Sequence, residues 1–300
     1  MAERGRVRLA LDDYPWQGEV WLDLLGSPVR VRSTVPSVTR LLAELSASLV
    51  ARASEGDARR ELTFHEETVL GAIRYAVTVD GVRSVDTPAS SVAFAQLMFD
   101  LNQVAIDAAE QPALVHAAAA GAPAGAVLLP GGMGAGKSTL VAGLVQRGLR
   151  YLTDEVVAID KDGTVRPYPK HLSLGERTSP VLADLDACVP NDPDGLLGGR
   201  RLVPPSCLRG GGVGPAMAPR LVVLPEFAPG ADTRLEPLPA PEALFALAAH
   251  TFRLDREPAR SLATLESVAA GCACFRLVSG DLDRACELVL GLLEPLGART

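Results

Sequence analysis

Apolar and polar residues over positions 1–110 follow both the short period of strands and the longer period of helices. Apolar residues at helical spacing predict helices over Val38–Ala51 and Ser90–Ala109. Asp80–Gly81 lies after a strand-like run and is typical of a hairpin turn. Short apolar runs predict strands at Arg6–Ala10, Glu19–Leu24, Val29–Arg32, Glu61–Phe64 and Ala72–Val79. We therefore expect a small α+β N-terminal lobe over residues 1–110.

From residue 111 onward, apolar runs alternate with glycine-rich turns. Ala126–Leu129 is typical of a buried strand, and Ser138–Arg147 carries its apolar residues on one helical face. Lys161–Gly163 predicts a turn that returns the chain as a hairpin. Further strands are expected at Arg150–Asp160, interrupted by Thr153, Asp154 and Glu155, and at Arg220–Leu224 and Cys272–Val278. Further helices are expected at Pro241–Thr251, Ala259–Ala270 and Asp281–Leu292. This order predicts an α/β domain over residues 111–300, with a mixed sheet because of the hairpin.

One long segment, Asp186–Pro219, has little periodicity and is rich in glycine and proline. A long structureless segment inside a compact domain is usually a functional loop or a disordered one. Its paired arginines, Arg200 and Arg201, are candidate substrate-binding residues in a lid over an anionic acceptor. The alternative is a solvated loop with exposed arginines.

Composition and charge narrow the classes of function. The 300 residues include 36 acidic and 29 basic side chains, for a net charge of −7, which argues against a nucleic-acid partner. The nearly uncharged stretch Gln111–Ser138 has a strongly apolar part of only strand length, so we expect no membrane partner. The N-terminal residues show no signal-peptide pattern. The five cysteines form no even disulfide framework, so we expect reduced thiols and a cytoplasmic protein. His65, His171 and His250 lack acidic or cysteine partners at ligand spacing and are expected to be structural or surface residues.

The sequence G-G-M-G-A-G-K-S, residues 131–138, fits the P-loop pattern G-x-x-x-x-G-K-[ST] at every fixed position. Glycines let backbone N–H groups face a phosphate, and the start of the following helix adds partial positive charge. Lys137, expected as a surface cation, would meet the outer phosphates, and Ser138 would bind Mg²⁺. A plain glycine turn, the alternative, leaves the Lys–Ser pair unexplained. The candidate residues for binding ATP are Gly131, Gly132, Met133, Gly134, Ala135, Gly136, Lys137, Ser138 and Thr139.

An acidic pair, Asp154–Glu155, follows the motif after a short apolar run. Carboxylates at this position can hold Mg²⁺ together with Ser138, or accept the proton of an attacking hydroxyl. On spacing alone, a solvent-facing acidic turn has nearly equal weight.

Several stretches around the motif resemble the catalytic domain of HPr kinase/phosphorylase, and more closely the HPr-kinase-related proteins. The ATP-type phosphoenolpyruvate carboxykinases share that fold family. The resemblance covers about residues 111–295, and the N-terminal lobe matches only in general layout. It implies an α/β kinase domain with a P-loop core and a mixed sheet. The stretches are His116–Ala118, Ala126–Pro130, the P-loop, Arg147–Glu155, Arg220–Pro225, Thr233–Leu238 and Phe275–Leu277.

The resemblance also implies roles for single residues. His116 matches a histidine near the transferred phosphate, and Asp154 matches the general base. Glu155 takes the second acidic position, where the family commonly has aspartate. Lys170 matches a basic residue that contacts phosphate or substrate. The arginine- and glycine-rich signature of the HPr kinases is not visible near Leu172–Arg177, which argues against HPr as the acceptor and against the reverse, phosphorylase reaction.

The sequence thus predicts an ATP- and Mg²⁺-dependent kinase that phosphorylates a hydroxyl of a peptide, a protein or a small amino-acid-like acceptor. Lys137, Asp154 and His116 are the expected catalytic residues, and Ser138, Asp154 and Glu155 the expected metal ligands. One alternative is a nucleotide-binding regulatory or assembly ATPase that makes no phosphorylated product. A decarboxylating kinase is the other, although the chain is short for it and shows no second metal-binding set. A homo-oligomer remains open.

Overall fold

The computed structural model describes residues 14–51, 59–175, 180–209 and 212–297. The strand predicted at Arg6–Ala10 lies outside these residues. The chain forms two compact units: residues 1–109 with 190–202, and residues 110–189 with 203–300. The second unit contains the P-loop motif and the acidic pair.

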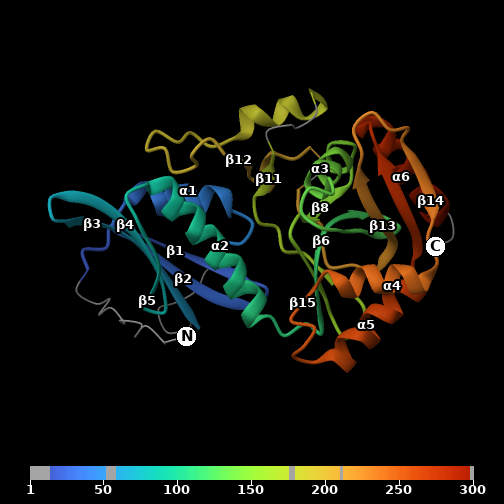
Figure 1. Cartoon of the computed structure of the whole chain (residues 1–300), viewed down its shortest axis with the longest axis horizontal. Helices are drawn as coiled ribbons and strands as arrows, with labels where there is room; N and C mark the ends of the chain where they lie inside the picture. The colour runs from blue at the N-terminus through green and yellow to red at the C-terminus, as the bar shows by residue number, and fades with distance from the viewer. Residues whose placement is uncertain (1–13, 52–58, 176–179, 210–211, 298–300) are drawn as a thin grey trace. The chain divides into compact units, whose positions relative to one another are not determined.

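The first unit is a five-stranded sheet with two helices. The strands follow the order β1-β2-β3-β4-β5, with β2 and β3 parallel and the other neighbours antiparallel. Asp80 and Gly81 both have positive φ, which confirms the predicted hairpin turn between β4 and β5. Helix α1 packs on β1 and β2, and α2 packs on β3, β4 and β5 (Figure 1). The elements are β1 Gly18–Leu24, β2 Ser27–Ser33, α1 Pro36–Leu45, β3 Arg60–Val69, β4 Ala72–Val79, β5 Val82–Thr87 and α2 Ser90–Ala108.

A mixed sheet forms the centre of the second unit, which confirms an α/β fold. Its main path runs β10-β9-β6-β7-β13-β16-β14, with β8 and β15 also paired to β6. Strands β7, β13 and β16 are parallel, whereas β6, β10 and β14 run antiparallel to their neighbours. The strands are β6 Ala113–Ala122, β7 Gly125–Pro130, β8 Arg150–Thr153, β9 Val156–Ile159, β10 Val165–Arg166, β13 Pro219–Phe227, β14 Arg234–Pro237, β15 Thr251–Phe252 and β16 Ala273–Ser279.

Helices cover both faces of this sheet, giving three layers. Alternate residues of β6 and β7 enter two separate cores, with Val127 and Leu129 in one and Ala126 and Leu128 in the other. Helices α3 and α6 close the first core, and α4 and α5 close the second. The helices are α3 Lys137–Gln146, α4 Ala240–Ala249, α5 Pro258–Gly271 and α6 Leu282–Gly297; Leu172–Leu174 and Arg201–Val203 are the short strands β11 and β12, and Pro180–Cys188 and Pro205–Cys207 are 3₁₀ turns.

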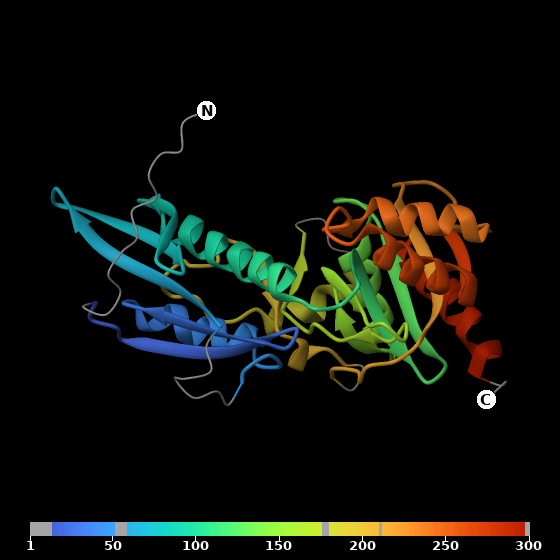
Figure 2. The same cartoon turned by 90° about the horizontal axis from the view of Figure 1, so that it is seen from below.

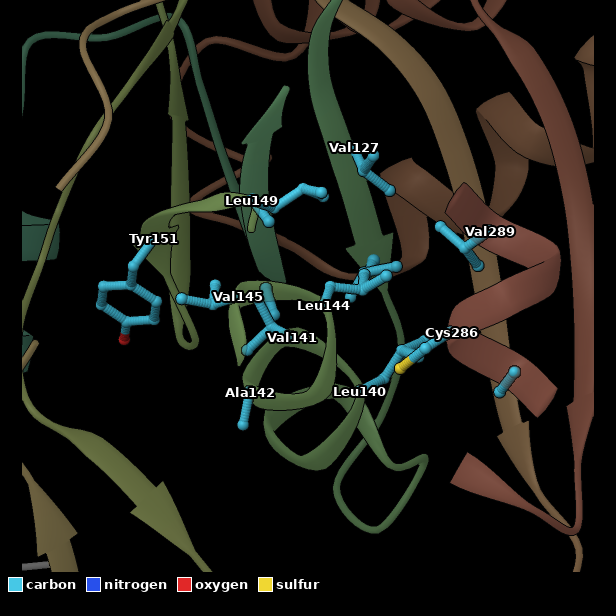
Figure 3. Packing of buried hydrophobic residues seen from close by; sticks show 14 of the residues in the cluster. Val127, Leu140, Val141, Ala142, Leu144, Val145, Leu149, Tyr151, Cys286 and Val289 are labelled. Carbon is cyan, nitrogen blue, oxygen red and sulfur yellow. The ribbon is translucent and has the colours of Figure 1, made fainter. Parts of the chain in front are cut away.

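The packing of α3 fixes the start of that helix relative to the sheet. Figure 3 shows Leu140 and Leu144 of α3 facing Cys286 and Val289 of α6. All four side chains are buried. Burial of a leucine side chain contributes about 1.5–3 kcal/mol, so this contact gives the helix N-terminus a stable position.

The turn between β6 and β7 depends on a glycine, and we expect Gly125→Ala to destabilise the protein by about 2 kcal/mol or more. Gly125 has a φ of +130°, and an added Cβ would lie 2.6 Å from the backbone oxygen of Ala218. Gly291→Ala is the matched control, because Gly291 lies in α6 with no atom within 4 Å of an added Cβ. The control should be stabilised by about 0.5–1 kcal/mol. Urea unfolding of both variants tests this; equal stabilities would contradict it.

The interruption expected within Arg150–Asp160 separates two strands, β8 and β9. The Thr153 hydroxyl accepts hydrogen bonds from the N–H groups of Glu155 and Val156 and turns the chain there. The structure corrects two other expectations. The alanine-rich run over residues 113–122, for which no strand was predicted, is β6, the strand to which β7, β8, β9 and β15 pair. Asp186–Pro219 is not structureless, since it contains β12, the 3₁₀ turn Pro205–Cys207 and the end of the 3₁₀ turn Pro180–Cys188.

Residues 190–202 also belong to the first unit rather than to the predicted domain 111–300. Local contacts explain this: Arg200 donates a hydrogen bond to the backbone oxygen of Ser91, and an added Cβ on Gly198 would lie 2.8 Å from Ser91 Cβ. Residues 190–202 are drawn in yellow in Figure 2. Among the described residues, no helix is long and apolar enough to cross a membrane.

Candidate functional site

The glycine-rich loop, residues 131–136, connects the buried end of β7 to the start of α3. Gly134 and Gly136 have φ of +81° and +92°, a conformation that side-chain-bearing residues rarely adopt. Gly136 is the N-cap of α3, and no side chain in the described part of the chain caps the helix there. The first N–H groups of α3 are therefore available to an anion.

Lys137 turns back onto this loop. Its ammonium Nζ donates hydrogen bonds to the backbone oxygens of Gly131 at 2.7 Å and Gly132 at 2.9 Å. The residue is only 7% exposed, so the expectation of a surface cation is wrong. Burial lowers the pKa of Lys137, while the nearby Glu155 and Asp154 oppose that shift. The side chain of Lys137 thus lies inside the loop, and its ammonium is close enough to Asp154 and Glu155 to feel their negative charge.

Asp154 occupies the break between β8 and β9 and is buried. Its carboxylate accepts hydrogen bonds from Ser138 Oγ at 3.3 Å and Tyr151 OH at 3.0 Å. It also accepts one from the N–H of Ser173 at 3.1 Å and pairs with Lys170 Nζ at 3.0 Å. Burial by itself would raise the pKa of Asp154, but Lys170 and the Ser173 N–H outweigh burial and lower it. Asp154 is therefore a fixed carboxylate that stays ionised.

Glu155, next in sequence, has a side chain that is 35% exposed and fewer contacts. Its carboxylate lies 3.7 Å from Lys170 Nζ and 3.6 Å from His116 Nε2. Burial and the charge of Lys137 lower the pKa of His116, so its imidazole is neutral at pH 7. The His116 ring packs against Phe252 of β15, with ring centroids 5.7 Å apart.

A cavity of about 700 Å³ opens above these residues, entirely within the second unit. Part of the lining comes from the acidic pair, from His116 of β6 and from the β11 segment; β6, β8 and β9 lie on one side of β7 in the sheet. Another part comes from the carboxyl ends of β13 and β16, on the other side of β7, and from the first residues of α6. The lining residues are His116, Met133–Leu140, Asp154, Glu155, Ser173, Gly175, Pro225, Phe227 and Ser279–Leu282.

Most of the residues predicted from the sequence meet at this cavity. Met133 to Thr139, His116, Asp154 and Glu155 line it, and Lys170 reaches it through its contact with Asp154. Gly131 and Gly132 contribute their backbone oxygens to Lys137. Arg200 and Arg201 are not among the lining residues, and Arg200 bonds within the first unit. Their role in acceptor binding stays a prediction.

Three contributing residues were not expected from the sequence. Tyr151 places its ring in the core below α3 and its hydroxyl on Asp154, and Ser173 supplies a backbone N–H. His250 follows α4, and its Cε1 lies 4.0 Å from an added Cβ on Gly132. Its backbone oxygen accepts the N–H of His116. Of the three, only Tyr151 could have been suggested from the sequence, because it lies three residues before Asp154.

The oxygen atoms at the loop suit a hard cation. A serine hydroxyl and a carboxylate lie 3.3 Å apart, and Mg²⁺ commonly takes one or two protein oxygens and completes its shell with phosphates and water. The described residues contain no cluster of three or more histidine, cysteine or acidic side chains that could hold a metal alone. The donor set therefore fits Mg²⁺ that arrives with a phosphate ligand, and not a metal held by protein groups only.

No protein-family model matches this chain, and no curated protein matches it either. The assignment of a function therefore depends on the geometry of the cavity and on the sequence motif.

Proposed function

We propose that this protein is an ATP- and Mg²⁺-dependent kinase that transfers the γ-phosphate to a hydroxyl group. One observation carries the proposal: Ser138 Oγ, the second residue of α3, lies 3.3 Å from Asp154, with Lys137 and Glu155 beside them in a single cavity. A glycine turn alone would not bring a lysine, a hydroxyl and two carboxylates to the start of one helix. We further propose that the second unit has the P-loop core of the HPr-kinase and phosphoenolpyruvate-carboxykinase type.

In this proposal Ser138 and Asp154 hold Mg²⁺. The four neighbours of Asp154 fix its orientation, and its lowered pKa keeps it negatively charged, as a metal ligand must be. Bound Mg²⁺ would draw charge from the β- and γ-phosphates. The N–H groups at the start of α3 and the ammonium of Lys137 would stabilise the remaining charge.

Glu155 fits the role of general base better than Asp154 does. A carboxylate with four hydrogen-bonding partners and a lowered pKa is a poor proton acceptor. Glu155 lines the cavity with a partly exposed carboxylate beside the neutral His116. As the acceptor oxygen bonds to the γ-phosphorus, the bond from that phosphorus to ADP breaks and the acceptor proton moves to Glu155.

A transfer assay tests the proposal. The purified protein is incubated with Mg²⁺, ATP labelled on the γ-phosphate, and either cell extract or peptides that carry serine, threonine or tyrosine. We expect label on an acceptor, released as an alcohol phosphate ester by phosphatase. Labelled inorganic phosphate alone would favour the rival regulatory ATPase, and no release or transfer of label would contradict both.

A further inference from the structure

In the sheet, β13 and β16 lie on the opposite side of β7 from β6, β8 and β9, so part of the cavity lining lies away from the acidic pair. This part is formed by Pro225 and Phe227 of β13 and by the turn Ser279–Leu282 between β16 and α6. None of these residues has a task in the transfer step. The strands β13 and β16 run parallel, with Phe227 opposite Ser279. In open α/β sheets, ligands bind at the carboxyl ends of such strands.

Phe227 is the most informative residue of this part of the lining. It is the last residue of β13, and it is 50% exposed although it borders a cavity. Its Cβ lies 3.5 Å from the point that a Cβ on Gly136 would occupy. The aromatic side chain therefore starts directly beside the residue that caps α3. A partly exposed aromatic ring next to a phosphate-binding loop offers a flat apolar surface to a planar ligand.

The turn Ser279–Leu282, which begins beside Phe227 on the neighbouring strand, is held in one shape by its own contacts. An added Cβ on Gly280 would lie 2.0 Å from the backbone oxygen of Ala231, so only glycine fits there. The hydroxyl of Thr233 accepts the N–H groups of Gly280 at 3.1 Å and Asp281 at 2.9 Å. Asp281 then caps α6 by accepting the N–H of Arg284 at 2.7 Å. These contacts fix the backbone of the turn, which reduces the entropy lost on binding.

The charges set the direction of a bound nucleotide. The γ-phosphate must lie near Ser138 and Asp154, where the metal ligands meet. The phosphate chain then runs over the N–H groups at the start of α3. The nucleoside can leave the loop only away from Asp154 and Glu155, toward Phe227, because the acidic end has to admit the acceptor.

We propose that Phe227 stacks on the nucleobase of the bound nucleoside triphosphate, with the turn Ser279–Leu282 beside it. This inference rests on the proposed function, and it assigns the base subsite of the same cavity. It makes Phe227 a residue that supplies affinity for the nucleoside but none for the phosphates.

Calorimetric titrations with Mg²⁺-ATP and Mg²⁺-tripolyphosphate separate these contributions. Phe227→Ala should weaken ATP binding about tenfold or more, since stacking of a base on an aromatic side chain contributes about 1–3 kcal/mol. Binding of tripolyphosphate should stay unchanged, because it has no base. Phe245→Ala is the matched control: Phe245 is 76% exposed on α4, is absent from the cavity lining, and its loss should change neither affinity. Phe227→Trp should keep ATP affinity.

Equal ATP affinity in the wild type and Phe227→Ala would overturn the base subsite, and so would a parallel loss of ATP and tripolyphosphate affinity. Thermal unfolding of each variant shows whether a parallel loss reflects damage to the fold; if it does, Phe227→Leu, which keeps the apolar volume without the aromatic face, decides by the same two titrations. A wild-type protein that binds neither ligand would instead overturn the proposed function itself. The two failures are thus distinguishable.

Discussion

Lys137→Ala is expected to lower phosphoryl transfer by about a hundredfold or more, which is the usual cost of removing one charged or polar group that stabilises a transition state. Lys137 is the cation inside the loop, where its ammonium donates to the backbone oxygens of Gly131 and Gly132. In the proposed complex it would exchange these carbonyls for phosphate oxygens. The fold should persist, because Lys137 lines the cavity and belongs to neither hydrophobic core of the second unit. Steady-state assays with labelled ATP measure the transfer, and circular dichroism checks the fold.

Lys161→Ala provides the control for overall charge. Lys161 is an exposed lysine in the turn between β9 and β10, and its removal should leave the rate unchanged. Equal transfer by the wild type and Lys137→Ala would remove Lys137 from the site, and with it the interpretation of the loop as a phosphate site.

Asp154→Asn and Glu155→Gln should affect different steps, nucleotide binding in the first variant and proton transfer in the second. Asp154→Asn removes the carboxylate that we propose as a metal ligand, so Mg²⁺-dependent ATP binding should weaken and transfer should fall by about a hundredfold or more. Glu155→Gln removes only the proton acceptor, so ATP affinity should persist while transfer falls by about a hundredfold or more. Calorimetry with and without Mg²⁺ gives the affinity, and transfer under saturating ATP gives the rate.

The opposite pattern would identify Asp154 as the general base, which is the role that the sequence resemblance implies for it. Asp154→Asn would then bind Mg²⁺-ATP normally without transfer, and Glu155→Gln would transfer at the wild-type rate. Stability must be measured as well, because Asp154→Asn leaves the buried Lys170 without its nearest negative charge. Removing one partner of a buried ion pair costs about 3–5 kcal/mol, and the Lys170→Met/Asp154→Asn double variant separates this cost from the loss of function.

The sequence was informative wherever a local pattern carries its own physics. The hairpin at Asp80–Gly81 was predictable because few residue pairs accept positive φ, and the helix over residues 137–146 because its apolar residues repeat at helical spacing. The residues of the glycine-rich loop were identified from spacing alone, since a phosphate-binding turn needs its lysine and serine at one position relative to the glycines.

Other features were missed because their cause lies in distant residues. Strand β6 is mostly alanine, with no alternation of polar and apolar side chains, since both of its faces are buried under helices. The N–H of Ser173 reaches Asp154, 19 residues earlier in the chain, only through the tertiary fold.

By itself, then, the sequence determined the chemistry available to this protein: a glycine-rich loop with a lysine and a serine, followed by two carboxylates. Only the tertiary structure decided how the two carboxylates differ in burial and in partners. Folding buries Asp154 among four partners and leaves Glu155 partly exposed beside His116, although the two residues are adjacent in the chain. The physical reason is that burial, neighbouring charges and hydrogen bonds set the state of a carboxylate, and all three are properties of its surroundings in space.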